Sequence, residues 1–224
     1  MSSSTANLVV SPTPRGQGFF TAHPFLHPDM DTIVGITGAS GVVYGLRLLE
    51  ALPGRKTVIC SEDGVKLLEL ETGTVAQGLY DRADVHYENS DMFSPLASGS
   101  VRFDSLVIAP CSMSTMSKIA CGIADNLITR VAAVALKERR KLILLIRETP
   151  ISSIHLANLE RMALAGAIIM PASPAFYPEP KSVDQMVDFV VGRVLDQLGV
   201  THDLYRRWEG RKVTGSRGPR RRPR

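Results

Sequence analysis

Short apolar runs alternate with longer segments of helical spacing from residue 31 to residue 198. Each run holds about five residues, the usual length of a strand that is buried on both faces of a parallel sheet. The helical segments supply the crossovers that parallel strands require. The chain is therefore predicted to fold as a single doubly wound parallel sheet, a Rossmann-like three-layer α/β/α domain. The expected strands lie at 32–37, 56–60, 104–110, 142–146 and 167–170.

Helical spacing is most regular towards the end of the chain. Apolar side chains recur every three or four residues from Val183 to Leu198 without a break. Ser112 and Asp125 are expected helix N-caps, because their side chains can accept hydrogen bonds from free backbone N–H groups. Helices are predicted at about 42–52, 62–71, from 112 onward, 125–140, 151–165 and 182–198.

The composition excludes several classes of protein. Of 224 residues, 44% are hydrophobic and 21% are charged, which is the balance of an ordinary globular protein. No apolar run approaches the ~18 residues of a membrane helix. The cysteines, Cys60, Cys111 and Cys121, are odd in number and lack C-x-x-C spacing, which argues against a disulfide framework or a thiolate zinc site. A reducing compartment, the cytoplasm, is predicted.

The excess positive charge lies at the C-terminal end. The net charge is +4, yet residues 211–224 hold seven arginine or lysine residues and no acid, so the remainder carries a net charge of −3. Because the folded body is mildly acidic, no specific nucleic-acid partner is predicted. A flexible leader is expected at 1–30, one domain at 31–208 and a basic disordered tail at 209–224.

Residues that suit a bound phosphate follow four of the predicted strands. In doubly wound sheets, ligands bind beyond the carboxyl ends of the strands. Small residues there let backbone N–H groups approach an anion closely. The pattern predicts a site for one or two phosphorylated ligands, with Glu148 as its general acid or base. The segments are G-A-S-G at 38–41, P-C-S-M-S-T at 110–115, R-E-T-P at 147–150 and P-A-S-P-A-F-Y at 171–177.

Plainer interpretations of these residues stay open at this point. The loop at 38–41 is also typical of a bare tight turn, and the hydroxyl groups at 112–115 of simple helix capping. A structural ion pair would account for Arg147 and Glu148. Arg193 could lie along the core with only its head group in water.

Two further sets of residues are expected to be structural. The basic run at 139–141 is interpreted as a solvated helix end, where cations complement the helix dipole. Cys111 is expected to pack in the core rather than to act as a nucleophile, since no histidine lies near it in the sequence.

A nicotinamide-dependent reductase is another alternative, because T-G-A-S-G-V-V-Y-G at 37–45 is similar to the glycine loop of that class. However, the spacing is not G-x-G-x-x-G, and the second strand does not end in an acid that could hold a ribose. Tyr177 and Lys181 match a Y-x-x-x-K pattern, but Pro178 and Pro180 forbid the helix that would bring the pair together. The histidines show no metal-ligand spacing.

Taken in order, these motifs resemble those of the UbiX-like flavin prenyltransferases, within the wider flavoprotein group that includes cysteine decarboxylases. The resemblance runs from about Thr32 to Trp208, and the ordered set is far more specific than any one motif. Ser114 and Lys141 depart from it, because many relatives have lysine and proline there. The matching segments are G-A-S-G at 38–41, S-G-S at 98–100, P-C-S-M at 110–113, L-K-E-R-R at 136–140, R-E-T-P at 147–150 and P-A-F-Y at 174–177.

The resemblance implies a metal-independent transferase that joins the dimethylallyl group of dimethylallyl phosphate to N5 and C6 of reduced FMN. The product, prenylated FMN, would serve a partner UbiD-like decarboxylase. A large homo-oligomer, a dodecamer in the family, is implied as well. An FMN-dependent decarboxylase of the wider group and a flavin carrier are the two alternatives.

The resemblance also implies roles for individual residues. Three catalytic residues are implied: Glu148 and Ser40 as proton-exchanging groups, and Lys137 as a cation that stabilises the departing phosphate. FMN contacts are implied for Gly38, Ala39, Ser40, Ser61, Ser112, Met113, Ser114, Thr115 and Arg147. The dimethylallyl phosphate site is implied for Lys137, Arg147, Glu148, Tyr177 and Arg193, with Trp208 and with Glu71, which is expected to reach a neighbouring subunit.

Overall fold

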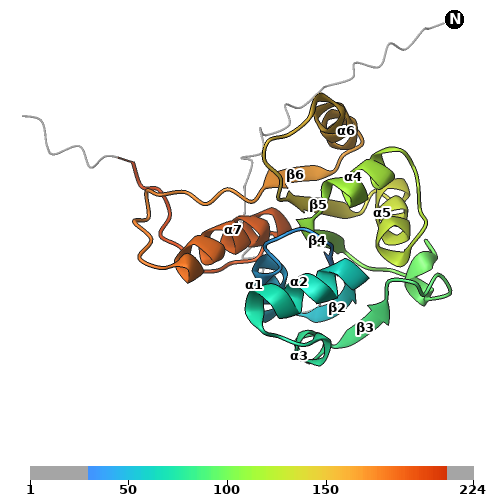
Figure 1. Cartoon of the computed structure of the whole chain (residues 1–224), viewed down its shortest axis with the longest axis horizontal. Coiled ribbons are helices and arrows are strands. Elements are labelled where there is room, and N and C mark those ends of the chain that lie inside the picture. The colour runs from blue at the N-terminus through green and yellow to red at the C-terminus, as the bar shows by residue number, and fades with distance from the viewer. Residues whose placement is uncertain (1–29, 211–224) are drawn as a thin grey trace, which may run out of the picture.

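Six parallel strands form one sheet in the computed structural model, which describes residues 30–210 (Figure 1). The order across the sheet is β3-β2-β1-β4-β5-β6, and each neighbouring pair is parallel. The chain starts in the middle, builds outward to β3 and then crosses back to β4, so the predicted doubly wound sheet is confirmed. The strands are β1 (Asp31–Ile36), β2 (Arg55–Cys60), β3 (Val85–Glu88), β4 (Ser105–Cys111), β5 (Lys141–Ile146) and β6 (Ile168–Pro171).

Helices cover both faces of the sheet and complete three layers (Figure 1). Alternate residues of each central strand serve opposite faces, because side chains alternate along a strand. Val34 of β1 therefore packs with the first helical layer, whereas its neighbour Ile33 packs with the second. The first layer holds α1 (Val43–Ala51), α2 (Glu62–Thr72), α3 (Ala76–Tyr80) and α7 (Val183–Leu198), and the second holds α4 (Met113–Ala120), α5 (Leu127–Lys137) and α6 (Ser153–Leu164).

Three short elements were absent from the prediction: β3, α3 and the 3₁₀ helix η1 (Pro95–Ala97). β3 is an edge strand of four residues, V-H-Y-E, in which half-buried and exposed positions alternate. It therefore lacks the continuous apolar run that marks the central strands. Only its pairing with β2 makes it a strand.

Helix α5 begins and ends at other residues than predicted. The N-cap is Asn126 rather than Asp125, because Asn126 and Thr129 form a reciprocal capping box. Asp125 instead forms an ion pair of 2.7 Å with Lys118. The helix ends at Lys137, short of the predicted residue 140, since Arg139 takes up the left-handed backbone conformation with φ 55°.

The described region begins at Met30, which is buried in the first layer's core, and its carbonyl oxygen accepts a hydrogen bond from the Arg55 N–H. The rest of the predicted leader and of the basic tail, residues 1–29 and 211–224, lies outside the described residues. Within residues 30–210, none of the helices combines the length and the apolar character needed to cross a membrane.

Candidate functional site

The ends of β1 and β4 are joined by Thr37, the buried residue that follows β1. Its hydroxyl donates a hydrogen bond of 2.8 Å to the Pro110 carbonyl oxygen and accepts one of 2.8 Å from the Ser112 N–H. Pro110 cannot donate to the ladder, and the pairing of β4 with β5 shifts register here. β1 and β4 also flank the point where the strand order reverses, which is where open α/β sheets bind ligands.

The loop at 38–41 packs closely against α2 and leaves the Ser40 hydroxyl group exposed. A Cβ atom on Gly38 would lie 2.7 Å from the Asp63 Cβ, so only glycine allows this approach to α2. Gly41 has φ +99°, a conformation that disfavours other residues. The Ala39 side chain is buried, whereas Ser40 is exposed. The predicted glycine loop is therefore a packed turn that presents Ser40 at the carboxyl edge of the sheet.

Glu71, in the last turn of α2, reaches the same loop. Its Oε2 atom accepts hydrogen bonds of 2.8 Å from the Gly41 N–H and 3.2 Å from the Val42 N–H. These donors lie at the start of α1, where the positive end of the helix dipole favours a negative charge. Within one chain, Glu71 therefore acts on its own glycine loop, and its expected contact with a neighbouring subunit stays a prediction.

Arg147 connects β5 to this loop. Its Nε atom donates a hydrogen bond of 3.0 Å to the Ser40 carbonyl oxygen. Burial raises the pKa of the Tyr44 hydroxyl, and the nearby Arg147 charge opposes that rise. Glu148 is exposed, and its Oε1 atom accepts a hydrogen bond of 3.1 Å from the Thr149 N–H. Because no ion pair joins Arg147 to Glu148 in the described structure, both groups are available to a ligand.

Serine hydroxyl groups cap the first turns of two helices at the same carboxyl ends of the strands. Ser61 caps α2 by accepting a hydrogen bond of 3.1 Å from the Gly64 N–H. Ser112 caps α4 by accepting one of 3.2 Å from the Thr115 N–H, and its own hydroxyl donates to Thr115 Oγ1 at 3.0 Å. Ser114 is exposed, but the Met113 side chain is buried, so Met113 offers a ligand only its backbone.

These residues fit a phosphorylated flavin by their chemistry. Serine and threonine hydroxyl groups and backbone N–H groups complement a polyhydroxyl chain and a phosphate, and Arg147 adds a cation. A cavity of about 740 Å³ begins at Ser61 and extends along α2 and α3 to the residues that follow β3. The donor set therefore suits FMN, with Gly38, Ala39, Ser40, Ser61, Ser112, Met113, Ser114, Thr115 and Arg147 as the residues that would hold it.

Lys137 lies at the amino ends of the strands, opposite the carboxyl ends that carry Arg147 and Glu148. It ends α5 and precedes the start of β5, whereas Arg147 follows the end of β5. Because β5 has six residues, the two edges lie about 20 Å apart. The Lys137 Nζ atom pairs with the exposed Glu138 Oε1 at 2.6 Å. The prediction that Lys137 shares one crevice with Arg147 and Glu148 is therefore wrong for a single chain, since α5 runs antiparallel to the strands.

The basic run after Lys137 is only partly a solvated helix end. Arg140 donates hydrogen bonds of 2.7 Å to the Val101 carbonyl oxygen and 2.9 Å to the Gly99 carbonyl oxygen. Its guanidinium group lies over the Phe103 ring at 4.3 Å. A Cβ atom on Gly99 would lie 2.5 Å from Lys137 Nζ. For Arg140 the prediction is corrected: this side chain holds the S-G-S loop against the end of α5.

Tyr177 and Trp208 meet in a third place, beside α7. Their ring centroids are 5.3 Å apart in an edge-to-face arrangement, and Tyr177 also packs edge-to-face on Phe189 at 5.9 Å. Arg193 lies on the outer side of α7, near Phe189 and Pro171. Its Nη1 atom pairs with Asp196 Oδ2 at 2.8 Å. The structure thus brings Tyr177 and Trp208 together, and it holds Arg193 in a network that the sequence did not reveal.

The buried thiols are structural. Burial raises the pKa values of Cys60 and Cys111 to about 12, so neither forms a thiolate near neutral pH. The expectation that Cys111 packs in the core is confirmed, because its side chain is fully buried at the end of β4. Within residues 30–210, no cluster of three or more His, Cys, Asp or Glu side chains is arranged to hold a metal ion.

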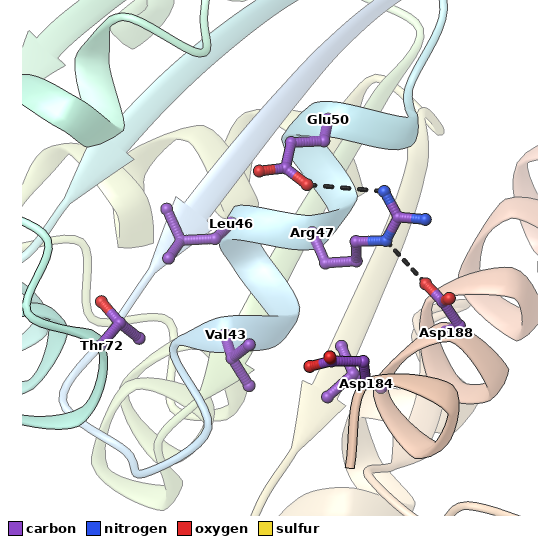
Figure 2. Close-up of a pocket in the computed structure, with 8 residues that line it drawn as sticks. Val43, Leu46, Arg47, Glu50, Thr72, Asp184 and Asp188 are labelled. Atoms are coloured by element: carbon purple, nitrogen blue, oxygen red, sulfur yellow. Dashed lines mark hydrogen bonds and ion pairs between the residues drawn. The ribbon is translucent and has the colours of Figure 1, made fainter. Parts of the chain in front are cut away.

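A further cavity of about 390 Å³ lies between α1 and α7, away from these hydroxyl groups (Figure 2). Arg47 is its cation, and Figure 2 shows it turned towards Asp188 and Glu50. The Arg47 Nε atom lies 2.6 Å from Asp188 Oδ1, and Nη1 lies 3.5 Å from Glu50 Oε2. Because two carboxylates already neutralise Arg47, this cavity does not suit an anionic ligand.

Comparisons with known proteins agree over most of the chain. Residues 23–195 match the family model described as flavoprotein. A flavin prenyltransferase UbiX from Methanocaldococcus jannaschii is 52% identical over 181 residues, which cover 80% of this chain and 98% of that relative.

Two solved structures share the fold. The crystal structure of AnUbiX in complex with FMN and dimethylallyl pyrophosphate has a TM-score of 0.81 and 37% identity, and the match covers 82% of this chain and all of that one. A dodecameric FMN-dependent UbiX-like decarboxylase from Escherichia coli O157:H7 has a TM-score of 0.79 and 42% identity, with 81% of this chain covered. The likeness therefore spans the full length of both solved chains.

Proposed function

Because this chain belongs to the UbiX flavin prenyltransferases of the flavoprotein family, we propose that it transfers a dimethylallyl group from dimethylallyl phosphate to reduced FMN. One observation carries the proposal: the exposed Ser40 hydroxyl, the Ser112–Thr115 hydroxyl pair and the Arg147 guanidinium meet at the reversal point of a sheet whose AnUbiX counterpart binds FMN and dimethylallyl pyrophosphate. In this reaction the allylic carbon–oxygen bond breaks, phosphate leaves, and the freed carbon bonds to flavin N5, which loses its proton. The alkene then takes up a proton as its tertiary carbon bonds to C6, and C6 loses its own proton.

Residues at the carboxyl edge of the sheet would hold the acceptor. Reduced FMN supplies the electron-rich atoms N5 and C6. Arg147 and the hydroxyl groups of Ser61, Ser112 and Thr115 would bind its polar side chain and phosphate, and the Ser40 hydroxyl would handle a proton near N5. Fixing the acceptor against the donor makes an intermolecular encounter unimolecular, an effect worth ~7 kcal/mol or more when alignment is good.

Cations and a tyrosine hydroxyl would stabilise the leaving phosphate. Lys137, Arg147, Arg193 and Tyr177 are proposed for this task, because hydrogen bonds and charges aimed at a developing anion lower the barrier. Glu148 would exchange a proton with the departing phosphate, and its exposed carboxyl group has only one backbone partner among the described residues. Trp208 and Glu71 would complete the walls of the site.

One chain does not hold all of these groups together, so we infer that copies of the chain share the site. Lys137 lies at the opposite edge from Arg147 and Glu148. An assembly in which the amino edge of one copy meets the carboxyl edge of another would supply the missing lysine. The dodecamer formed by the E. coli relative supports such an arrangement.

The product, prenylated FMN, is proposed to pass to a UbiD-like decarboxylase. The three free cysteines are consistent with the proposed cytoplasmic location, where thiols stay reduced. The description of the E. coli relative as a decarboxylase keeps an FMN-dependent decarboxylation as the second candidate. A decarboxylase would not need the phosphate-binding cations Lys137 and Arg193.

An anaerobic assay tests the proposal. The purified protein is mixed with reduced FMN and either dimethylallyl phosphate or dimethylallyl pyrophosphate, and the flavin is analysed by mass spectrometry. A flavin heavier by one five-carbon unit supports the transferase, and the two donors reveal which leaving group is accepted. Unchanged flavin with both donors contradicts the proposal and leaves a decarboxylase or a flavin carrier.

A further inference from the structure

The segment that follows α7, residues 201–208, folds back along this helix and is called the strap. His202 and Tyr205 of the strap press on Gly192, where a Cβ atom would lie 2.7 Å from both rings. Arg206 donates a hydrogen bond of 3.1 Å to the Tyr177 carbonyl oxygen in the coil before α7. The strap therefore ties the coil that follows α7 to the coil that precedes it (Figure 1).

Asp196 lies at the centre of the strap's contacts, and its side chain is only 15% exposed. One oxygen, Oδ2, accepts hydrogen bonds from Arg193 and Tyr205, and the other, Oδ1, faces His202 and Arg207. The distances are 2.8 Å to Arg193 Nη1, 2.6 Å to the Tyr205 hydroxyl, 3.1 Å to His202 Nε2 and 2.7 Å to Arg207 Nη2. A single carboxylate thus connects α7 to three residues of the strap.

His202 contributes to this network through both of its ring nitrogens. Its Nδ1 atom accepts a hydrogen bond of 3.2 Å from the Leu204 N–H, so the ring proton belongs on Nε2, which faces Asp196. The imidazole therefore donates to Asp196 and accepts from the backbone of the strap. Burial raises the pKa of Asp196, but hydrogen bonds from Arg207 and Tyr205 outweigh it and bring the pKa to about 2.

The network retains an excess positive charge. Two arginines share one carboxylate, so Asp196, Arg193 and Arg207 together carry a net charge of +1. In the described structure Arg193 uses only Nη1 for these bonds. Its Nε and Nη2 atoms are left for a ligand, and the side chain borders a cavity of about 290 Å³ that Ser173 and Phe189 also line. Asp196 therefore fixes Arg193 without neutralising the site.

The strap also positions the aromatic side chains. Tyr205 packs on Phe189 with ring centroids 4.7 Å apart, and Phe189 in turn packs on Tyr177. Tyr177 meets Trp208 at the end of the strap. A displacement of the strap at Asp196 would therefore move Trp208 away from Tyr177.

We propose that Asp196 is a positioning residue that holds Arg193 and the strap in place to bind the phosphate of the prenyl donor. The proposal rests on the proposed function, since it assigns Asp196 to the donor half of that site. Asp196 does not touch the donor itself. It holds Arg193 through Nη1, which leaves Nε and Nη2 for the phosphate, and it keeps Trp208 packed on Tyr177.

The test compares Asp196→Asn with a matched control, Asp203→Asn. Asp203 is an exposed carboxylate on the same strap, and its side chain makes no hydrogen bond among residues 30–210. Trp208 is the single tryptophan of the chain, so its fluorescence anisotropy reports the strap alone. Calorimetry of the FMN-saturated full chain measures the Kd of dimethylallyl phosphate without requiring turnover.

Asp196→Asn is expected to lower the anisotropy of Trp208 and to weaken dimethylallyl phosphate binding by about tenfold or more, with FMN affinity unchanged. Asp203→Asn is expected to match the wild type in all three measurements. An Asp196→Asn chain that binds the donor within twofold of the wild type overturns the proposal, whether or not the strap moves. Equal losses of donor and FMN affinity overturn it too, because they indicate general unfolding.

Tyr205→Phe provides a milder variant if Asp196→Asn does not fold. It removes one hydrogen bond to Asp196 and keeps the ring that packs on Phe189. A smaller loss of donor affinity, in the same direction, is expected, and no loss counts against the proposal. A wild type that binds dimethylallyl phosphate but makes no prenylated flavin refutes the proposed function and leaves the role of Asp196 standing on the binding data.

Discussion

The Glu71 carboxylate accepts a hydrogen bond of 2.8 Å from the Gly41 N–H and thereby ties the end of α2 to the loop that begins α1. The contact places a negative charge at the positive end of a helix. It also stabilises the glycine loop from which Ser40 is presented. The geometry of this loop therefore depends on a residue 30 positions further along the chain.

Glu71→Ala should destabilise the fold by about 1 kcal/mol, because two backbone N–H groups lose their acceptor at a partly exposed site. Glu71→Gln should lose less than half of that, since its amide oxygen can still accept. Urea unfolding of the two variants measures the difference. Glu69→Ala, at an exposed position of the same helix, is the control. Equal losses for Ala and Gln would show that the hydrogen bonds contribute nothing.

Arg147→Ala should weaken FMN binding by about tenfold to a hundredfold, as expected for the loss of a charged hydrogen-bonding group worth about 1.5–3 kcal/mol. The variant also frees the Ser40 carbonyl oxygen, so the loop loses its connection to β5. Quenching of flavin fluorescence on binding gives the Kd. Arg102→Ala removes an exposed arginine elsewhere and should leave the Kd unchanged. An unaltered Kd in Arg147→Ala removes this residue from the flavin site.

Mixing two impaired variants should restore activity if copies of the chain share the site. Lys137→Ala and Glu148→Gln alter residues at opposite edges of the sheet. Each variant alone should lose most of its prenyl transfer, by about a hundredfold. Co-assembled, some sites would combine an intact Lys137 from one copy with an intact Glu148 from another. Mass spectrometry of the flavin measures the recovery, and a mixture no better than its components excludes sharing.

Gly192→Ala should destabilise the protein even though alanine is the better helix former. At a solvent-exposed position inside a helix, replacing glycine by alanine raises the free energy of unfolding by about 1 kcal/mol. Here the new Cβ atom would lie 2.7 Å from the rings of His202 and Tyr205, and overpacking of this kind costs about 1–3 kcal/mol. Thermal unfolding and the anisotropy of Trp208 should both report the change. Gln197→Ala, on the same helix, is the control, and a rise in the Tm of Gly192→Ala would contradict the expectation.

Asp196 should make the protein more sensitive to acid. Its pKa falls from the ordinary 3.8 to about 2 on folding. A lowered pKa contributes stability that is fully present above pH 3.8 and is lost as the pH falls through about 2. The contribution amounts to about 2 kcal/mol for this mostly buried carboxylate. The stability gap between the wild type and Asp196→Asn in urea should narrow from pH 5 to pH 2.5, and a constant gap would contradict this origin.

The alternation of apolar runs and helical spacing determined the sheet, since every central strand is buried on both faces and therefore carries a continuous apolar signal. The same signal is missing from β3, whose residues alternate at the sheet edge, and pairing with β2 decides that strand. The sequence also located the loops after β1, β4 and β5, because parallel strands bring their carboxyl ends to one edge.

Only the tertiary structure decided how the remaining site residues are distributed. Lys137 is near Arg147 in the sequence but lies at the other edge, because a crossover helix runs antiparallel to the strands it connects. The network around Asp196 had no signal in the sequence, since its partners belong to a helix and to a coil whose path no local pattern sets. Local propensity and hydrophobic burial determine elements and layers, whereas the meeting of polar side chains from separate elements follows from the packing of the whole chain.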